Sequence, residues 1–402
     1  MSRWLSIVGI GEDGLAGLGA VARALVDDAT VLIGGDRHLA MLPDDGRERL
    51  TWPSPLAKLV DEIVARRGQA VCVLATGNPQ FYGVGVTLGR RVPAEEMTII
   101  PAPSAFALAA ARLGWAQAET EMLTLHGRPL ESLVPSLQPG ARLLLLSHDR
   151  ATPAAVAELL KRQGFGPSPM TVLAHMGGSD EARLDCIAAD WRPTTVVADF
   201  NTIAVDCRLA PGQRAPSRLP GLPDTAFEHD GQMTKQEVRA ITLAALAPAP
   251  GQLLWDVGAG AGSVAIEWLR ADRRNRAIAI ECDAERRRRI AANASALGTP
   301  GLVIKDGRAP AALADLPAPD AIFVGGGLTA PGMLEACWPR LAAAGRLVAN
   351  AVTVDGESVL YRWHDEIGGD MKRVSVSRAE PVGERLGWRP MMSVTQLVAV
   401  KS

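Results

Sequence analysis

Residues 253–268, LLWDVGAGAGSVAIEW, carry the residue types of a ligand-binding turn. An apolar run contains one acid, Asp256, glycines follow at every second position from 258 to 262, and an apolar-periodic stretch resumes. This order predicts a strand, a tight turn and a helix that hold the polar end of a ligand. We expect ligand contacts from Asp256 and from the loop residues Gly258, Ala259, Gly260, Ala261 and Gly262.

The same residues bear on which ligand is bound. A dinucleotide fingerprint reads G-x-G-x-x-G, and its third glycine would fall at Ser263. A carboxylate at Asp256 can meet an ammonium group, which S-adenosylmethionine carries, but it sits poorly beside a pyrophosphate. Glu281 ends the next apolar run, where an acid can bind both ribose hydroxyls, although NAD-dependent enzymes share such an acid. The loop favours S-adenosylmethionine, and an NAD-dependent reductase or a turn without ligand are the alternatives.

A second group of turns rich in glycine and proline lies in the first half of the chain. IVGIGEDGLAGL (7–18) and ATGNPQFYGVG (75–85) each place glycines beside a β-like run. IIPAPSAFALAAARLGW (99–115) predicts a strand, a turn fixed by proline and a helix, and LTLHGR (123–128) ends a later strand with an ionisable pair. The glycine loops of the two halves are not copies of each other, so the chain joins two different ligand-binding folds.

These turns must be positioned by α/β elements in both halves. Short β-like runs, among them AVCVLAT (70–76), TTVVAD (194–199) and DAIFVGG (320–326), alternate with helix-like stretches, which predicts largely parallel sheets. A segment rich in proline and glycine at 208–230 is interpreted as a linker or as a segment lying along a domain surface. The predicted domains are 1–207, divided into subdomains of about 1–115 and 120–207, and 231–402.

The composition gives no support for a nucleic-acid-binding, metal-binding or membrane-spanning protein. The 402 residues carry a net charge of -2, which gives no electrostatic reason to expect nucleic acid or an anionic membrane as a partner. The cysteines and histidines are dispersed, with no C-x-x-C pair, so we expect reduced thiols and no metal site. No apolar run approaches the length of a membrane span, and the first residues reach glycine and acid too soon for a signal peptide. The sequence predicts a soluble cytoplasmic protein.

The second half resembles a known family. GQMTKQEVRA (231–240), the glycine loop, GRAPAAL (307–313) and VANAVT (348–353) together are similar to the decarboxylating C15-methyltransferases of cobalamin biosynthesis, over about residues 225–402. That resemblance implies a class I, Rossmann-like methyltransferase fold in which Thr234, the loop, Glu281 and Ala309 contact S-adenosylmethionine. Relatives often read G-D-A-P where this chain has Gly307-Arg308-Ala309-Pro310, so an acid at the adenine, if one is used, is displaced to Asp306.

The first half resembles the tetrapyrrole methylase family, the class III methyltransferases, over about residues 3–205, with the carbon 5 methylases of the cobalamin pathway as the best match. This family binds the methyl donor in a cleft between two α/β subdomains. Many relatives have G-D-P where this chain has Gly77-Asn78-Pro79, and we assign no acid–base role to Asn78. The resemblance implies donor contacts, largely through backbone groups, from Gly9, Gly11, Thr76, Gly77, Asn78, Pro79, Tyr82, Pro103, Ser104 and Ala105.

Together the two resemblances imply a bifunctional C-methyltransferase that methylates carbons 5 and 15 of a precorrin and decarboxylates an acetate side chain, with one S-adenosylmethionine per domain. Methyl transfer from a sulfonium to carbon mainly requires alignment and exclusion of water. We select His126 as general acid–base, Arg128 as a partner of substrate carboxylates and Glu380 as the acid for decarboxylation. Members of both families commonly form assemblies, so the resemblance implies a homo-oligomer. A cobalt-containing macrocycle, or a first half that only holds the substrate, are the alternatives.

Overall fold

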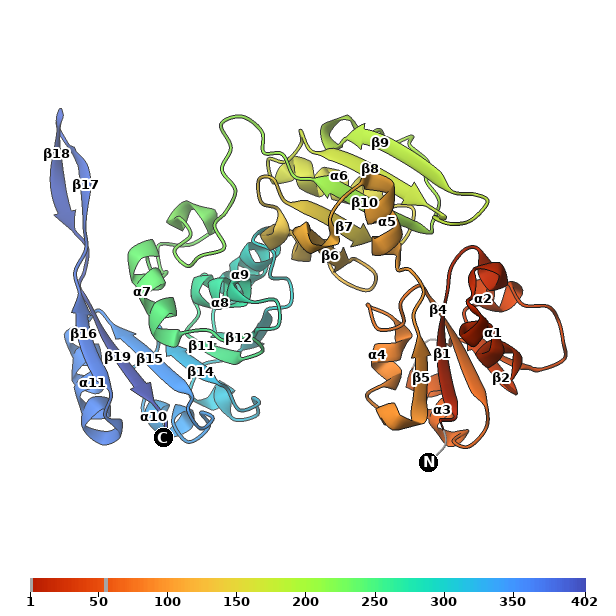
Figure 1. Cartoon of the computed structure of the whole chain (residues 1–402). Coiled ribbons are helices and arrows are strands. Elements are labelled where there is room, and N and C mark those ends of the chain that lie inside the picture. The colour runs from red at the N-terminus through yellow and green to blue at the C-terminus, as the bar shows by residue number, and fades with distance from the viewer. Residues whose placement is uncertain (1–2, 54–56) are drawn as a thin grey trace. The chain divides into compact units, whose positions relative to one another are not determined.

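The computed structural model describes residues 3–53 and 57–402, and the chain divides into two compact units, each built from strands and helices (Figure 1). The first unit comprises Met1–Leu130 and Ser136–Ala215, and the second comprises Glu131–Pro135 and Pro216–Ser402. The predicted α/β class is confirmed in both units.

The first sheet of the N-terminal unit has five parallel strands in the order β3-β2-β4-β1-β5. Alternate residues of its strands enter two apolar clusters, one containing residues of helices α1 and α2 and the other residues of α3 and α4. Because the strands are parallel, the turns after β1, β4 and β5 meet at one edge. The bounds are β1 Leu5–Ile10, β2 Val31–Gly34, β3 Glu48–Thr51, β4 Val71–Thr76, β5 Met97–Ile100, α1 Ala20–Asp27, α2 Asp36–Ala40, α3 Ala57–Ala65 and α4 Val84–Leu88.

The second sheet of this unit corrects the prediction of largely parallel sheets. Its order is β6-β7-β10-β8-β9, and of the pairs described only β6 with β7 is parallel. The predicted strand at 194–199 is wrong: its Val196 is 88% exposed, and the strand is the buried run that follows, β10. The bounds are β6 Thr120–Thr124, β7 Arg142–Leu146, β8 Pro169–Ala174, β9 Ala182–Ile187, β10 Asn201–Asp206 and helix α6 Thr152–Arg162.

Helix α5 (Ala105–Leu113) packs on the second sheet. Its Phe106 and Ala109 share an apolar cluster with Leu144 of β7 and Ala204 of β10. The chain therefore crosses from the first sheet to the second before this helix, whereas the sequence-based subdomain boundary at about 115 lies after it. An alanine-rich helix carries no sequence signal for which of two sheets it covers.

The C-terminal unit contains a seven-stranded sheet in the order β13-β12-β11-β14-β15-β19-β16. The five strands from β13 to β15 are parallel, and β19 pairs antiparallel with β15 and β16. Because β11 lies between β12 and β14, the turn after β11 lies at the topological switch point of the sheet. The bounds are β11 Leu253–Val257, β12 Arg276–Glu281, β13 Val303–Asp306, β14 Ala321–Val324, β15 Arg346–Ala351, β16 Asp370–Val374 and β19 Val394–Val400.

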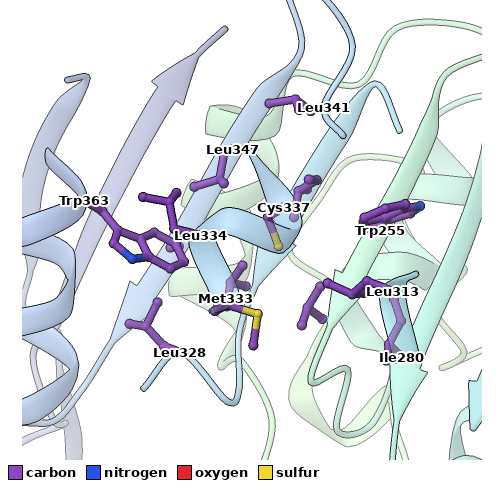
Figure 2. Packing of buried hydrophobic residues seen from close by; sticks show 14 of the residues in the cluster. Trp255, Ile280, Leu313, Leu328, Met333, Leu334, Cys337, Leu341, Leu347 and Trp363 are labelled. Atoms are coloured by element: carbon purple, nitrogen blue, oxygen red, sulfur yellow. The ribbon is translucent and has the colours of Figure 1, made fainter. Parts of the chain in front are cut away.

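Two apolar clusters pack on opposite faces of this sheet. On β11, Trp255 belongs to one cluster and its neighbour Leu254 to the other, as alternating strand residues require. Figure 2 shows Trp255 and Trp363 at either end of the first cluster, with Met333 and Cys337 between them. The helices are α7 Gln236–Leu246, α8 Ser263–Ala271, α9 Ala284–Ala296, α10 Met333–Cys337 and α11 Val354–Ile367.

Part of the segment rich in proline and glycine lies on the C-terminal unit. Leu222 and Phe227 are buried in its core. The carboxylate of Glu267 accepts hydrogen bonds from the backbone N–H of Gly221 (2.6 Å) and Leu222 (3.0 Å) and pairs with the buried Arg239 guanidinium (2.6 Å). Residues 221–227 are therefore an integral part of this unit, with Leu222 and Phe227 in its core.

A separate two-stranded hairpin, β17 (Ser377–Val382) with β18 (Arg385–Pro390), extends from the C-terminal unit (Figure 1). Its apolar side chains face solvent, since Val382, Leu386 and Trp388 are 66%, 73% and 78% exposed. A lone hairpin has little core of its own, so these residues are available for contact with another surface.

Candidate functional site

The C-terminal unit contains a cavity of about 810 Å³ at the carboxyl ends of β11, β12, β14 and β15. This is the edge at which parallel α/β sheets bind their ligands, and the volume lies in the range of small-molecule pockets. The structure brings together at this cavity six residues that the sequence predicts: Thr234, Gly258, Ala259, Gly260, Glu281 and Ala309.

The glycine loop is shaped by close backbone approaches. Gly258 and Gly260 have φ of +70° and +59°, which side-chain-bearing residues rarely adopt. A Cβ on Gly258 would lie 2.6 Å from the Cα of Gly326, in the turn after β14, and a Cβ on Gly260 would lie 2.9 Å from the carbonyl oxygen of Gln232. The alternating glycines therefore let the turns after β11 and β14 and the segment before α7 meet around one cavity.

Glu281 is buried where it ends β12, and its carboxylate is fixed by the loop. Oε2 accepts a hydrogen bond from the Gly260 N–H (2.9 Å) and Oε1 accepts one from the Asp283 N–H (3.0 Å). The Cys282 S–H also donates to Oε1 (3.8 Å), so Oε2 is the oxygen that keeps a lone pair for a hydroxyl of a ligand. A buried, oriented acid of this kind fits the ribose of S-adenosylmethionine.

Asp256 does not line the cavity among the residues that the structure describes, in contrast to the predicted contact with an ammonium group. Its carboxyl is buried below the loop, and its Oδ2 accepts a hydrogen bond from the Ala265 N–H of helix α8 (3.0 Å). Oδ2 therefore supports the start of the helix, whereas Oδ1 has no hydrogen-bond partner among the described residues, and the predicted contact of Asp256 with an ammonium group stays a prediction.

Asp256→Asn is expected to remove the pH dependence that the buried Asp256 carboxyl gives to the free energy of unfolding. Burial raises the pKa of the Asp256 carboxyl from 3.8 to about 7, so between these values the folded unit keeps a proton that the unfolded chain has released. Wild-type stability therefore falls as pH rises from about 4 to about 7, by up to about 1.4 kcal/mol per pH unit. In denaturant titrations, the free energy of unfolding of the variant should rise relative to that of wild type as pH increases across this window. A difference between the two free energies that does not change with pH would contradict the raised pKa.

Three other predicted contacts lie outside the described lining of the cavity. Ala261 and Gly262 begin the turn into α8, where a Cβ on Gly262 would lie 2.9 Å from the Ile290 side chain, so this glycine serves packing. Asp306 ends β13, is largely exposed and pairs with Arg287 (2.7 Å). Of the two residues predicted near the adenine, Ala309 lines the cavity and Asp306 is not among its described lining residues, and both contacts stay predictions.

In the N-terminal unit, three turns converge at the edge of the parallel sheet. A Cβ on Gly9 of β1 would lie 2.0 Å from the Gly77 carbonyl oxygen and 2.4 Å from the Ala102 nitrogen. The Gly77 N–H donates to the Ile10 carbonyl oxygen, and the Ala102 N–H donates to the Gly77 carbonyl oxygen, both at 3.1 Å. The turns after β1, β4 and β5, which carry most of the predicted donor contacts, thus form one structure. Pro103 and Ser104 complete it, since a Cβ on Gly77 would lie 2.9 Å from the Pro103 carbonyl oxygen.

Several side chains around these turns form hydrogen bonds, and one of them, Tyr82, connects the two sheets of the unit. Thr76 Oγ1 lies 3.1 Å from Arg37 Nη2 and 3.0 Å from His38 Nε2. Burial, together with the Arg37 charge, lowers the pKa of His38 to about 4, so this imidazole is neutral at physiological pH. The Tyr82 hydroxyl donates to the Met122 carbonyl oxygen of β6 (3.1 Å), across the two sheets. Asn78 accepts from the Gln80 N–H (2.9 Å) and shapes its own turn.

The three predicted catalytic residues have different surroundings. His126 is exposed and its ring centroid lies 5.1 Å from that of His148, which sequence reasoning missed. The Arg128 guanidinium lies 5.6 Å from the centroid of the Tyr82 ring, beside the predicted donor contacts. Glu380 is on the exposed hairpin, pairs with Arg389 (2.9 Å) and is not among the described residues that line the cavity. The choice of Glu380 as acid is therefore not supported by its position.

Comparison with known proteins agrees with two joined domains. Residues 5–190 match the family described as tetrapyrrole (corrin/porphyrin) methylases, and residues 225–401 match the family described as precorrin methyltransferase domain. A protein of Sinorhizobium sp named precorrin-6Y C(5,15)-methyltransferase [decarboxylating] is 50% identical over 397 residues, which cover 98% of this chain and 96% of that protein.

Two shorter relatives match about half of the chain. A cobalt-precorrin-7 C(5)-methyltransferase of Salmonella typhimurium is 31% identical over 50% of this chain and 96% of its own length. A probable cobalt-precorrin-6B C(15)-methyltransferase (decarboxylating) of Pyrobaculum calidifontis is 35% identical over 46% of this chain and 96% of its own length.

The fold and the glycine-lined site, with these matches, define a methyltransferase that uses S-adenosylmethionine. The chain belongs to the family of decarboxylating precorrin-6Y C(5,15)-methyltransferases. Within residues 3–53 and 57–402, no helix is long and apolar enough to span a membrane, and no group of three or more metal-ligating side chains gathers.

Proposed function

We propose that each unit holds one S-adenosylmethionine and carries out one methylation of precorrin-6Y. The C-terminal unit methylates carbon 15 and removes the carboxyl group of the ring C acetate, and the N-terminal unit methylates carbon 5, which yields precorrin-8. The observation that carries this proposal is the presence of two separate glycine-shaped turns, each at the carboxyl edge of a parallel sheet in its own unit. Shorter relatives named for one carbon each support one activity per unit.

The residues of the two sites are proposed to bind and align the donor. In the C-terminal unit, Glu281 accepts bonds from the ribose, the backbone at Gly258–Gly260 holds the amino acid end, and Thr234 and Ala309 contact the rest. In the N-terminal unit, the turns at 9–11, 76–79 and 103–105 hold the donor. Bound S-adenosylmethionine supplies an activated methyl group, so the protein supplies alignment and exclusion of water.

His126 and Arg128 remain our proposals for the N-terminal site. Both follow β6, and Arg128 lies beside the ring of Tyr82. A guanidinium can hold a substrate carboxylate through paired hydrogen bonds, and an exposed imidazole can accept the proton that carbon 5 loses on methylation. The same chemistry on a cobalt-containing macrocycle is the second candidate, favoured by the names of the two shorter relatives.

The proposed ligand is tested by calorimetry of the full chain with S-adenosylhomocysteine and, separately, with NADH. Binding of S-adenosylhomocysteine without measurable NADH binding is expected, because the third glycine of the dinucleotide fingerprint is replaced by Ser263. Tight NADH binding would contradict the assignment and favour a reductase.

We also propose that the protein works in the cytoplasm as a homo-oligomer. The exposed apolar side chains of the β17–β18 hairpin support self-association, since such residues are commonly covered by a partner. The formal net charge of -2 gives no reason to include nucleic acid among the partners.

A further inference from the structure

A polar cluster of one half-buried and two fully buried residues lies beside the cavity of the C-terminal unit. It consists of Asn350 on β15, Thr242 on α7 and Gln396 on β19. Asn350 and Gln396 are directly opposite each other in the antiparallel pair of β15 and β19 (Figure 1), and α7 packs against β15. Of the three residues, Asn350 lines the cavity.

The cluster fixes the orientation of the Asn350 side chain. Asn350 Nδ2 donates to Thr242 Oγ1 (3.0 Å), and Asn350 Oδ1 accepts from Gln396 Nε2 (2.9 Å). Gln396 Nε2 also lies 3.2 Å from Thr242 Oγ1, so each residue contacts both of the others. These bonds leave the second Nδ2 hydrogen of Asn350 for a group in the cavity.

Stability alone does not account for this cluster. Thr242 and Gln396 are fully buried, and Gln396 Oε1 has no hydrogen-bond partner among the described residues. A buried polar atom without a partner costs free energy, and apolar side chains of similar volume would avoid that cost. The arrangement is therefore best explained by what it does for Asn350.

Several apolar side chains line the same cavity as Asn350. Val352, Met391, Met392 and Val394 line it. Thr353 lies there too; its hydroxyl caps α11 by accepting from the Gly356 N–H (3.2 Å) and keeps its own hydrogen as a second donor. Asn350 thus offers an oriented N–H donor in surroundings that suit the flat apolar face of a macrocycle.

We infer that Asn350 binds the acetate carboxylate that is lost, and that Thr242 and Gln396 are positioning residues for it; this inference rests on the proposed function of the C-terminal unit. A neutral amide orients the carboxylate without the full charge pairing by which an arginine would stabilise the ground state. When the carbon–carbon bond to the carboxyl breaks, its electron pair enters the conjugated imine of the macrocycle. Carbon dioxide leaves, and the methylene carbon then takes a proton from solvent.

The test uses the full chain and measures carbon dioxide released per methyl group added at carbon 15. Asn350→Asp places a negative charge against the substrate carboxylate, so release per methyl should fall at least about tenfold and a methylated product that keeps its carboxyl should accumulate. Thr242→Val removes the hydroxyl that holds Asn350 and should lower the same ratio by a smaller factor. Damage to the fold would lower both events together and leave the ratio unchanged.

Asn275→Asp is the matched control. Asn275 is a buried asparagine of this unit that bonds to the Trp268 carbonyl oxygen and the Gly251 N–H and is not among the described residues that line the cavity. In this variant, the amount of carbon dioxide released per methyl group added at carbon 15 should equal that of wild type. Wild-type ratios in both Asn350→Asp and Thr242→Val would overturn the inference, whereas a wild-type chain that neither methylates nor decarboxylates would instead refute the proposed function.

Discussion

Gly9→Ala is expected to abolish methylation of carbon 5 while methylation of carbon 15 and release of carbon dioxide continue. The added Cβ would lie 2.0 Å from the Gly77 carbonyl oxygen and 2.4 Å from the Ala102 nitrogen, both of which are backbone atoms. The three turns must therefore separate by about an ångström, and displacements of that size cost on the order of 10²-fold in rate. Mass spectrometry with fragmentation of the product reports which carbon was methylated.

Gly19→Ala is the matched control for Gly9→Ala. Gly19 lies in the same unit at the start of α1, its φ is -66°, and nothing lies within 4 Å of the added Cβ. This variant should methylate both carbons at wild-type rates. If Gly9→Ala also methylated carbon 5 normally, the N-terminal unit would be a carrier of the macrocycle without catalytic function.

Gly258→Ala is expected to produce the reciprocal result. The added Cβ would lie 2.6 Å from the Cα of Gly326, and the φ of +70° would strain any side chain. The turns after β11 and β14 would move apart, so methylation of carbon 15 and release of carbon dioxide should fall together by about 10²-fold or more. Methylation of carbon 5 should persist.

Gly301→Ala serves as the control for Gly258→Ala, since nothing lies within 4 Å of a Cβ at position 301 of the same unit. Both activities should survive in it. Loss of carbon 5 methylation in Gly258→Ala, with carbon 15 unaffected, would reverse the proposed assignment of the two units.

The parts that the sequence predicts well are local. Strand, turn and helix at 253–268 are neighbours in the chain, and glycine at 258 and 260 is required by backbone geometry, so residue types alone reveal the turn. The ends of β1 and β4 are predictable for the same reason. Glu281 was found because an acid at the end of the second strand has a fixed place in such folds.

The parts that the sequence does not reveal depend on contacts between distant segments. Antiparallel pairing in the second sheet joins β8 and β10 through partners that no local pattern specifies, and TTVVAD has strand-like residues but not the burial of β10. Asp256 occupies an expected position, yet the hydrogen bond from the Ala265 N–H of α8 to its Oδ2 is a contact that the local pattern does not specify.

The residues that line the cavity near Asn350 are likewise not predictable from local sequence patterns. Asn350 and Met391 come from segments about 40 residues apart, and although Asn350 lies within VANAVT (348–353), the sequence does not show that its side chain meets Met391 at one cavity. Glu380 is chosen as an acid in RAEPVG (378–383) without a structural pattern behind it, and pairing of β17 with β18 places it on the hairpin. Only the fold decides which of these residues meet.

A direct count of bound S-adenosylhomocysteine per chain, by calorimetry, tests the division between the units most directly. Two molecules are expected on the wild-type chain and one on each of Gly9→Ala and Gly258→Ala. One molecule on the wild-type chain, or a count that either substitution leaves unchanged, would contradict one donor site per unit.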